Sequence, residues 1–282
     1  MGSTLADAMS TGATWSASFG SASLSAMQVY DELMVPRVFE PWAKLVVDLL
    51  AVAPGEAVLD VACGPGSVAR VAAGRVGTAG RVTACDLSPA MLAVAQAKPP
   101  VDGAAAIIYL EAPADRLPVE DAAFDVVVCQ QGLQFFPDRA AAVAEMLRAL
   151  RPGGRVGVAV WTEIDRSPAW SVLADAIEEV AGSELAERYR GGPWGFPDGQ
   201  RLAALLEDAG FHEVRISKHV LPVTFEQGPA QVATTLAASG IAEQVGRLSS
   251  EDRQRLVQAI ANRLGSGSID SEMESNIAIA RR

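Results

Sequence analysis

Short apolar runs alternate with amphipathic stretches through the first part of the chain. The runs, which have the length and apolar character of strands buried on both faces of a sheet, lie at 57–61, 81–85, 107–111, 124–129 and 155–161. The stretches between them, with apolar residues at the three- and four-residue spacing of helices, lie at 67–75, 88–97 and 138–150. Strands that alternate with helices predict right-handed crossovers and a parallel sheet covered on both faces.

The pattern is less regular on either side of this region. Helical spacing predicts further helices at 27–52 (divided at Pro36 and Pro41), 168–181, 199–209, 229–245 and 250–264. Residues 213–220 alternate between polar and apolar, which is typical of an edge strand with one solvated face. The apolar run at 276–280 predicts a final strand.

Residues 1–26 form a low-complexity segment rich in Ser, Ala, Thr and Gly, with Asp7 as its one charged residue. Such a composition buries too little apolar surface to order itself, so a flexible tail is expected. The alternative is an arm that folds over a bound substrate, with Trp15 and Phe19 as the residues that would dock.

Composition narrows the classes of partner. The chain has 282 residues, half of them apolar, and a net charge of −11, with no cluster of Lys and Arg beyond Arg281 and Arg282. An acidic chain without a basic patch is not expected to bind nucleic acid. The apolar runs are shorter than the ~18 residues of a membrane span, and a signal peptide is not evident. We therefore expect a soluble cytoplasmic protein, with Cys63, Cys85 and Cys129 as buried reduced thiols.

The stretch from Val58 to Ala69 carries the strongest chemical signal. It consists of an apolar run, a turn with Gly64 and Gly66, and a helix start, a unit that lets backbone approach a ligand closely. Dinucleotide-binding enzymes share this glycine spacing, so an NAD-dependent oxidoreductase is one alternative. Asp60, however, would repel a pyrophosphate and suits a ligand with positive charge.

A second carboxylate, Asp86, ends the next apolar run, 26 residues after Asp60. There a carboxylate can accept hydrogen bonds from a ribose diol. A ribose joined to a cationic group without phosphates describes S-adenosylmethionine (SAM).

Five motifs occur in the order that one family shows: D-V-A-C-G-P-G, A-C-D-L-S-P-A-M-L, R-L-P, F-D-V-V-V-C-Q-Q-G-L-Q-F-F-P-D and L-R-P-G-G-R-V. The chain resembles the class I SAM-dependent methyltransferases, and within them the group of ubiquinone/menaquinone-type and bacterial small-molecule methyltransferases. The resemblance is strong from Tyr30 to Trp161 and looser over 193–220 and 275–282.

This resemblance implies an α/β fold, a Rossmann-like, doubly wound, mostly parallel sheet of seven strands in the order 3-2-1-4-5-7-6, the last strand antiparallel. One methyltransferase domain over 27–282 is then expected, with a helical lid built from 27–52, 162–198 and 221–270. The lid should gather over the carboxyl ends of the strands.

The resemblance also implies a set of cofactor-binding residues. They are Asp60, Ala62, Gly64, Gly66, Asp86, Leu87, Met91, Ala114, Asp115, Gln130 and Gln131. Asp60 and the glycines would lie by the methionine part of SAM, Asp86 by the ribose, and Leu87 and Met91 by adenine. Both apolar residues could equally belong to the core.

One position departs from the family pattern. Members commonly carry Asp or Asn four residues before the Leu-Pro pair, where this chain has Pro113. Pro113 offers neither a side-chain acceptor nor a backbone donor, so adenine recognition would fall to Ala114 and Asp115. Gln130 and Gln131 would meet cofactor and substrate, or else serve as structural amides.

Methyl transfer from a sulfonium is an in-line displacement, for which a protein supplies mainly orientation and a dry site. Glu163, after the fifth strand, and His219, at the lid side of the edge strand, are the candidate catalytic bases, with Tyr30 and Tyr189 as weaker ones. His212 is expected at the opposite end of the sheet. No cluster with metal-ligand spacing is evident, so no metal is expected.

The aromatic residues Trp42, Trp170, Trp194 and Phe196 in the lid segments favour a small, mostly apolar acceptor. The predicted function is methylation of such an acceptor at oxygen or carbon, by a monomer or homodimer. The alternatives are a SAM-binding protein of this fold that catalyses a reaction without methyl transfer, and a non-catalytic sensor.

Overall fold

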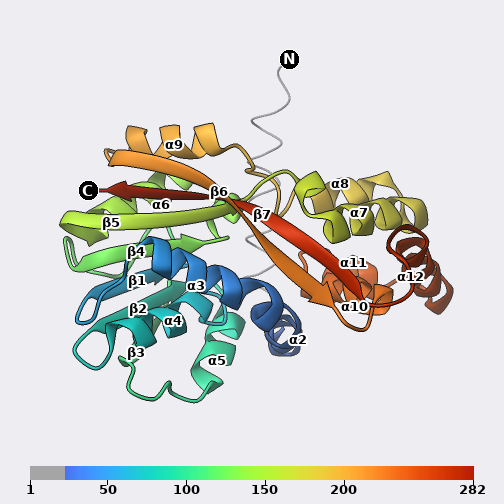
Figure 1. Cartoon of the computed structure of the whole chain (residues 1–282), viewed down its shortest axis with the longest axis horizontal. Helices are drawn as coiled ribbons and strands as arrows, with labels where there is room; N and C mark the ends of the chain where they lie inside the picture. Colours follow the sequence, from blue (N-terminus) through green and yellow to red (C-terminus); the bar gives the residue numbers. More distant parts are fainter. Residues whose placement is uncertain (1–22) are drawn as a thin grey trace.

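The computed structural model describes residues 23–282, within which seven strands form one sheet with helices on both faces (Figure 1). The strands are β1 (Ala57–Val61), β2 (Arg81–Asp86), β3 (Ile107–Glu111), β4 (Phe124–Gln130), β5 (Leu150–Trp161), β6 (His212–Phe225) and β7 (Ile269–Arg281). The longer helices are α2 (Leu24–Met34), α3 (Glu40–Leu49), α4 (Ser67–Val76), α5 (Pro89–Ala97), α6 (Arg139–Ala149), α7 (Pro168–Ala181), α8 (Ser183–Arg190), α9 (Gly199–Asp208) and α12 (Ser250–Leu264).

The strand order is β3-β2-β1-β4-β5-β7-β6, as predicted. β1 lies inside the sheet and pairs in parallel with β2 and β4, while β7 is antiparallel to both of its neighbours. β1 and β4 are buried along their whole length, and their apolar runs explain why their positions could be predicted from the sequence. The outer strand β3 is only partly buried.

Two strands are much longer than predicted. β6 and β7 pair from His212 and Arg281 as far as Phe225 and Ile269, and so run out of the sheet towards the lobe that contains α7, α8 and α12 (Figure 1). The outer part of β7 was missed because its apolar residues are sparse. Ile269 and Met273 are buried, but polar residues separate them. The segment expected as lid, 221–270, therefore includes the ends of both strands.

Elements differ from the prediction at three further places. Residues 229–245, predicted as one helix, form α10 (Pro229–Thr234), the 3₁₀ segment η4 (Thr235–Ala238) and α11 (Ala242–Gly246), because Ser239 and Gly240 interrupt the pattern. The short helix α8 was not predicted. β5 also starts earlier than expected, at Leu150.

The N-terminal helical region is continuous from α2 to α3. Between α2 and α3 lies the π-helical segment η1 (Val35–Phe39), which has Pro36 in its first turn, and Pro41 lies in the first turn of α3. Proline lacks the N–H that continues an α-helical ladder, so the widened turn takes the place of the predicted division. α2 begins at Leu24, inside the expected 1–26 tail; Trp15 and Phe19 lie outside the described residues.

Each face of the sheet carries its own hydrophobic cluster. One contains α6 and α9 through residues such as Met146 and Leu202, and the other contains α3 and α4 through residues such as Val46 and Ala72. The second cluster continues into the helical lobe, where it includes Leu173, Ile177, Leu256 and Ile260. Among residues 23–282, no helix combines the length and the apolar character that a membrane span requires.

Candidate functional site

A cavity of about 210 Å³ lies at the carboxyl ends of β1, β2 and β4. This is the edge where open α/β sheets bind their ligands. Ten of the eleven residues predicted to hold a cofactor line it: Asp60, Ala62, Gly64, Asp86, Leu87, Met91, Ala114, Asp115, Gln130 and Gln131. Residues predicted from motifs far apart in the sequence therefore lie together in the fold, at the ends of β1, β2 and β4 and in the loop after β3.

The two glycines of the turn have different roles. Gly64 lines the cavity with a φ of +53°, and a Cβ built there would find no atom within 4 Å, so the space beside it is open to a ligand. Gly66 does not line the cavity. It precedes α4 with a φ of +83°, and its Cβ would lie 2.8 Å from the Tyr109 hydroxyl. Gly66 thus serves the close packing of the turn against β3.

Two other residues adopt a left-handed backbone without being glycine. Ala62 follows β1 with a φ of +58°, and Gln131 follows β4 with a φ of +55°. Such conformations cost of order 1–3 kcal/mol each and persist where surrounding structure imposes them. Both residues line the cavity, so backbone strain is concentrated where a ligand would lie.

Asp86 holds the glycine turn against the end of β2. Its Oδ2 accepts a hydrogen bond from the Gly64 amide at 2.7 Å, and its Oδ1 accepts one from the Ser88 amide at 2.8 Å. Burial raises the pKa of this carboxyl group, and these amides partly offset the effect. A carboxylate has further acceptor positions on both oxygens, so Asp86 can also receive the hydroxyls of a ribose.

Asp60 is more deeply buried, with 1% of its surface exposed. Its Oδ2 accepts a hydrogen bond from the Ala69 amide at 2.9 Å, across the glycine turn. Burial raises the pKa of Asp60 to about 8, against the effect of that amide, and the nearby Asp86 carboxylate adds to the rise. A cation placed beside Asp60 would favour its ionised form.

Two buried polar atoms in the cavity wall have no partner among the described residues. Gln130 donates from Nε2 to the Phe39 carbonyl oxygen at 3.0 Å, while its buried Oε1 accepts no hydrogen bond. The buried Ser67 Oγ, beside the glycine turn, is also unpartnered. Buried polar groups are normally satisfied, so these atoms fit a wall that is completed by a polar ligand such as SAM.

One side of the cavity is lined by residues from segment 27–52, one of the segments expected to form the lid. Tyr30 of α2 and Phe39 of η1 line it, with their rings stacked 5.1 Å apart. Burial raises the pKa of Tyr30, with further contributions from Asp86 and Asp31. This cover of the cavity is held by Lys98, whose Nζ lies 2.6 Å from Asp31 Oδ1 of α2 and 2.8 Å from the Pro65 carbonyl oxygen.

A second, smaller pocket of about 80 Å³ adjoins the first, with which it shares Tyr30, Phe39, Gln131 and Phe135. Its other walls come from both lobes: Met34, Val38, Trp161, Trp170, Tyr189, Pro193, Trp194, Thr235, Ala238, Ser239 and Met273. The structure thus places an aromatic pocket directly beside the cavity of the predicted cofactor residues.

Of the four aromatic residues that were expected to favour an apolar acceptor, two line the smaller pocket. Trp170 and Trp194 line the smaller pocket, whereas Trp42 is buried in the core and meets Trp161 edge-on at 5.4 Å. Phe196 packs in the other hydrophobic cluster, where the guanidinium group of Arg139 lies 4.8 Å from its ring centroid.

The two candidate bases lie away from both pockets. Glu163 is exposed just after β5. His219, expected at the end of its strand, lies inside the longer β6 and shares a 2.9 Å hydrogen bond with Ser217. Neither residue lines either pocket. Within residues 23–282, no group of three or more His, Cys, Asp or Glu side chains is arranged to hold a metal ion.

Pro113, which departs from the family pattern, lies in the wall predicted to bind adenine. Pro113 lines the cavity together with Ala114 and Asp115, so this wall offers the backbone after Pro113 and one carboxylate. Met91 is buried in the wall, while Leu87 lies at the rim with 43% of its surface exposed.

Comparison with known proteins agrees with this geometry. A sequence profile of the ubiE/COQ5 methyltransferase family matches residues 21–225. The chain belongs to this family. Membership confirms the predicted class, the SAM-dependent methyltransferases, and with it the expected cofactor.

Individual relatives and solved structures are similar to the chain over different lengths. Demethylmenaquinone methyltransferase of Listeria welshimeri is 32% identical over 188 residues, which cover 63% of this chain and 79% of the relative. The uncharacterised protein Rv1405c of Mycobacterium tuberculosis is 39% identical over 130 residues, which span about half, 46%, of either chain. The [4+2]-cyclase SpnF has a similar fold, with a TM-score of 0.52 and 23% identity over 86% of this chain and 80% of its own.

Proposed function

We propose that this methyltransferase transfers the methyl group of SAM to an oxygen or carbon atom of a small, mostly apolar acceptor. The observation that carries the proposal is the junction of two pockets. The cavity lined by Asp60, Gly64 and Asp86 adjoins an aromatic pocket across Gln131. A cofactor in the first and an acceptor in the second would meet at that junction.

The residues of the larger cavity fit SAM by their chemistry. Asp86 would accept hydrogen bonds from the ribose hydroxyls, and the open space beside Gly64 would take the methionine part close to the backbone. Asp60, directly or through water, would face its positive charge. Met91 and Leu87 would contact the adenine, and Asp115 would receive a polar hydrogen at its edge.

When bound, SAM supplies an activated methyl group whose bonding electron pair stays on the sulfur after transfer. The protein's own part is to orient the acceptor and to exclude water. Aromatic rings of Tyr30, Phe39 and Phe135 surround the junction and suit that task. Neither Glu163 nor His219 lines a pocket. As proposed bases, they would therefore have to act through water or after a change of conformation.

The acceptor is inferred from the lining of the smaller pocket. Its walls are largely aromatic and aliphatic, and their polar groups are uncharged: those of Tyr30, Gln131, Tyr189, Trp194, Thr235 and Ser239. A pocket of this kind favours an apolar ring compound. The demethylmenaquinone methyltransferase of Listeria supports a quinone-like or related secondary metabolite as the acceptor class.

A second candidate function is catalysis without methyl transfer, or cofactor binding without turnover. The cyclase SpnF has a similar fold, and one fold can carry different chemistries, so we retain this second candidate. Product analysis separates the two functions. Methyl transfer yields one S-adenosylhomocysteine (SAH) for each methylated acceptor, whereas a cyclase or a sensor leaves SAH at background.

Calorimetric titration with SAM and with SAH tests the cofactor site. We expect micromolar binding of both, and about 5- to 150-fold weaker binding to Asp86→Ala, because the ribose hydroxyls and two backbone amides would lose their acceptor. Asp102→Ala, an exposed aspartate that lines neither pocket, is the matched control and should bind as the unmodified protein does. An unchanged dissociation constant in Asp86→Ala would refute the ribose assignment.

A further inference from the structure

The connection between β6 and β7 is far longer than the strands require. Antiparallel neighbours can be joined by a two-residue turn, yet residues 226–268 intervene between Phe225 and Ile269, which pair directly. This connection, which we call the insert, forms α10, η4, α11 and α12. It begins where the family match ends, at residue 225.

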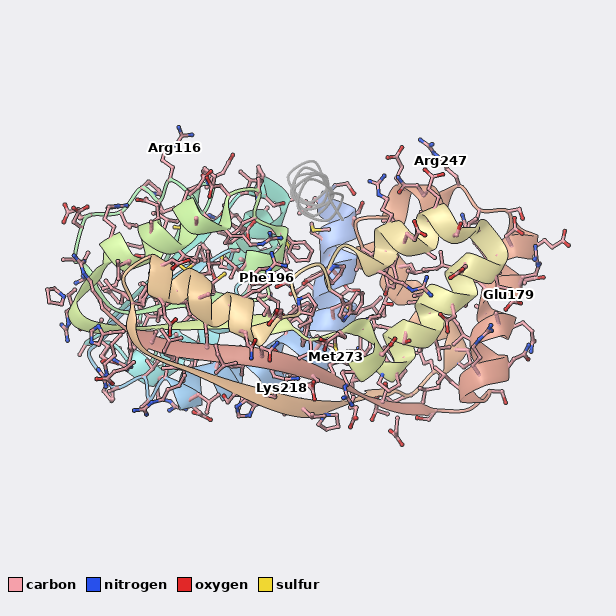
Figure 2. The ribbon with its side chains drawn as sticks, turned by 90° about the horizontal axis from the view of Figure 1, so that it is seen from above. Arg116, Glu179, Phe196, Lys218, Arg247 and Met273 are labelled. Atoms are coloured by element: carbon pink, nitrogen blue, oxygen red, sulfur yellow. The ribbon has the colours of Figure 1, made fainter. Side chains whose placement is uncertain are left out.

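The insert supplies one wall of the smaller pocket. Thr235, Ala238 and Ser239, all in or next to η4, line it. Met273, which lines it as well, lies on β7 where the sheet lobe meets the helical lobe (Figure 2). The part of the chain inside the family match supplies the opposite wall, including Trp161 and Trp170. The pocket is therefore closed by residues that the family match does not cover.

The size of this pocket limits what it can hold. Its volume of about 80 Å³ is smaller than the ~150 Å³ cavity in which benzene binds to an engineered protein. A ring must therefore lie partly across the junction, near Gln131 and Phe135, where it meets the cofactor cavity. Most of its lining residues are buried, Trp161 and Met273 among them, so little space remains between them for a long alkyl chain beyond the ring.

The lining also defines the chemistry of the occupant. None of the residues that line the smaller pocket carries a charge. Trp194 is 6% exposed, and its buried Nε1–H has no hydrogen-bond partner among the described residues. A buried donor without a partner is rare and favours a ligand that brings an acceptor atom to it. The pocket thus suits an uncharged ring that carries an oxygen.

We propose that the insert makes this protein selective for compact, uncharged oxygen-bearing ring compounds and excludes acceptors that carry a long alkyl or isoprenoid chain. This selectivity rests on the proposed methyl transfer at the same site. In that reaction a nucleophilic oxygen or ring carbon forms the new bond to the methyl carbon as the S–C bond breaks. The electron pair of that bond remains on sulfur, and the acceptor releases a proton to solvent.

The test uses the full-length protein saturated with SAH, titrated calorimetrically with 1-naphthol and with 1-naphthol carrying a decyl chain. On an open apolar surface the decyl chain would strengthen binding, because it adds buried area. We expect instead that the decyl compound binds at least about tenfold more weakly than 1-naphthol. Equal or tighter binding of the decyl compound would overturn the proposal.

Substitutions in η4 test whether the insert determines the selectivity for the acceptor. Ala238→Phe fills the pocket and should weaken 1-naphthol binding at least about tenfold, whereas Ala237→Phe, on the exposed side of the same segment, should change it less than about twofold. Equal effects of the two substitutions would overturn the proposal. Met273→Ala enlarges the pocket and should narrow the difference between 1-naphthol and its decyl derivative.

Binding of SAH separates the possible failures. Each variant should keep the SAH affinity of the unmodified protein, which reports that its sheet lobe is folded. If the unmodified protein does not bind SAH, the proposed function fails first. If it binds SAH but not 1-naphthol, only the acceptor class proposed for the insert is overturned.

Discussion

Asp60 is a carboxyl group in an interior that favours its neutral form. The Ala69 amide gives it one hydrogen bond, and no residue with a positive charge is among the groups that affect its pKa. Asp86 lies close enough to add to the rise in pKa. The cationic methionine part of SAM would provide the missing positive charge, so the cost of burying Asp60 is consistent with a binding role.

This burial makes a prediction for stability against pH. The pKa of Asp60 is about 8 in the folded protein and about 3.9 in an unfolded chain. Between these values the folded state holds a proton that the unfolded state has released, so stability falls as pH rises from about 4 to about 8, by at most about 1.4 kcal/mol per unit. Asp60→Asn cannot ionise and should lose this part of the dependence.

Urea unfolding of the unmodified protein and of Asp60→Asn at about pH 5 and about pH 8 measures the difference. The free energy of unfolding should fall more between these pH values in the unmodified protein than in the variant. Parallel changes in the two proteins would contradict the assignment of a raised pKa to Asp60.

At the scale of elements, the cover of the cavity depends on how α2 is held. Asp31 of α2 and Lys98, which follows α5, form an ion pair at 2.6 Å with side chains 22% and 18% exposed. Lys98 also donates to the Pro65 carbonyl oxygen in the glycine turn. A partly desolvated pair of this kind joins the helix over the cavity to the turn beneath it.

A double-mutant cycle with Asp31→Asn and Lys98→Met should give a coupling energy of about 1 kcal/mol in unfolding experiments. Both single variants should also release SAH faster, because α2 would open more readily over the cavity. The matched control is Lys44→Met, which breaks the exposed Lys44–Glu40 pair on α3 and should change stability by less than about 0.5 kcal/mol. Additive effects in the cycle would exclude a coupling between the two residues.

Elements and site differ in how far the sequence could predict them. The five parallel strands are short apolar runs, of which β1 and β4 are buried throughout, so the sequence predicted their positions. The motif resemblance predicted the sheet order. The outer halves of β6 and β7 were not predicted, because their pairing is long-range and Ile269 and Met273 are isolated apolar residues. The residues at the strand ends could be predicted from motif spacing. The left-handed backbone of Ala62 and Gln131 could not, since surrounding structure imposes it against their preference.

At the scale of the whole molecule, the two lobes visible in Figure 1 are joined by more than the β6–β7 pair. One hydrophobic cluster includes Val46 of the sheet lobe and Leu173 and Ile260 of the helical lobe. Trp170 meets Phe225 edge-on at 5.6 Å within the same cluster. Because exposing either lobe would expose the shared cluster, the lobes are expected to unfold together.

Scanning calorimetry should therefore give one transition, with equal calorimetric and van't Hoff enthalpies. SAH at about one hundred times its dissociation constant should stabilise the folded protein by about 2.7 kcal/mol and raise the midpoint of the whole transition by about 5–10 °C. Adenine alone, which lacks the ribose and methionine groups facing Asp86 and Asp60, is the control and should shift it far less. Two transitions, of which SAH moves one, would show that the helical lobe folds independently and that its pocket is not coupled to the cofactor site.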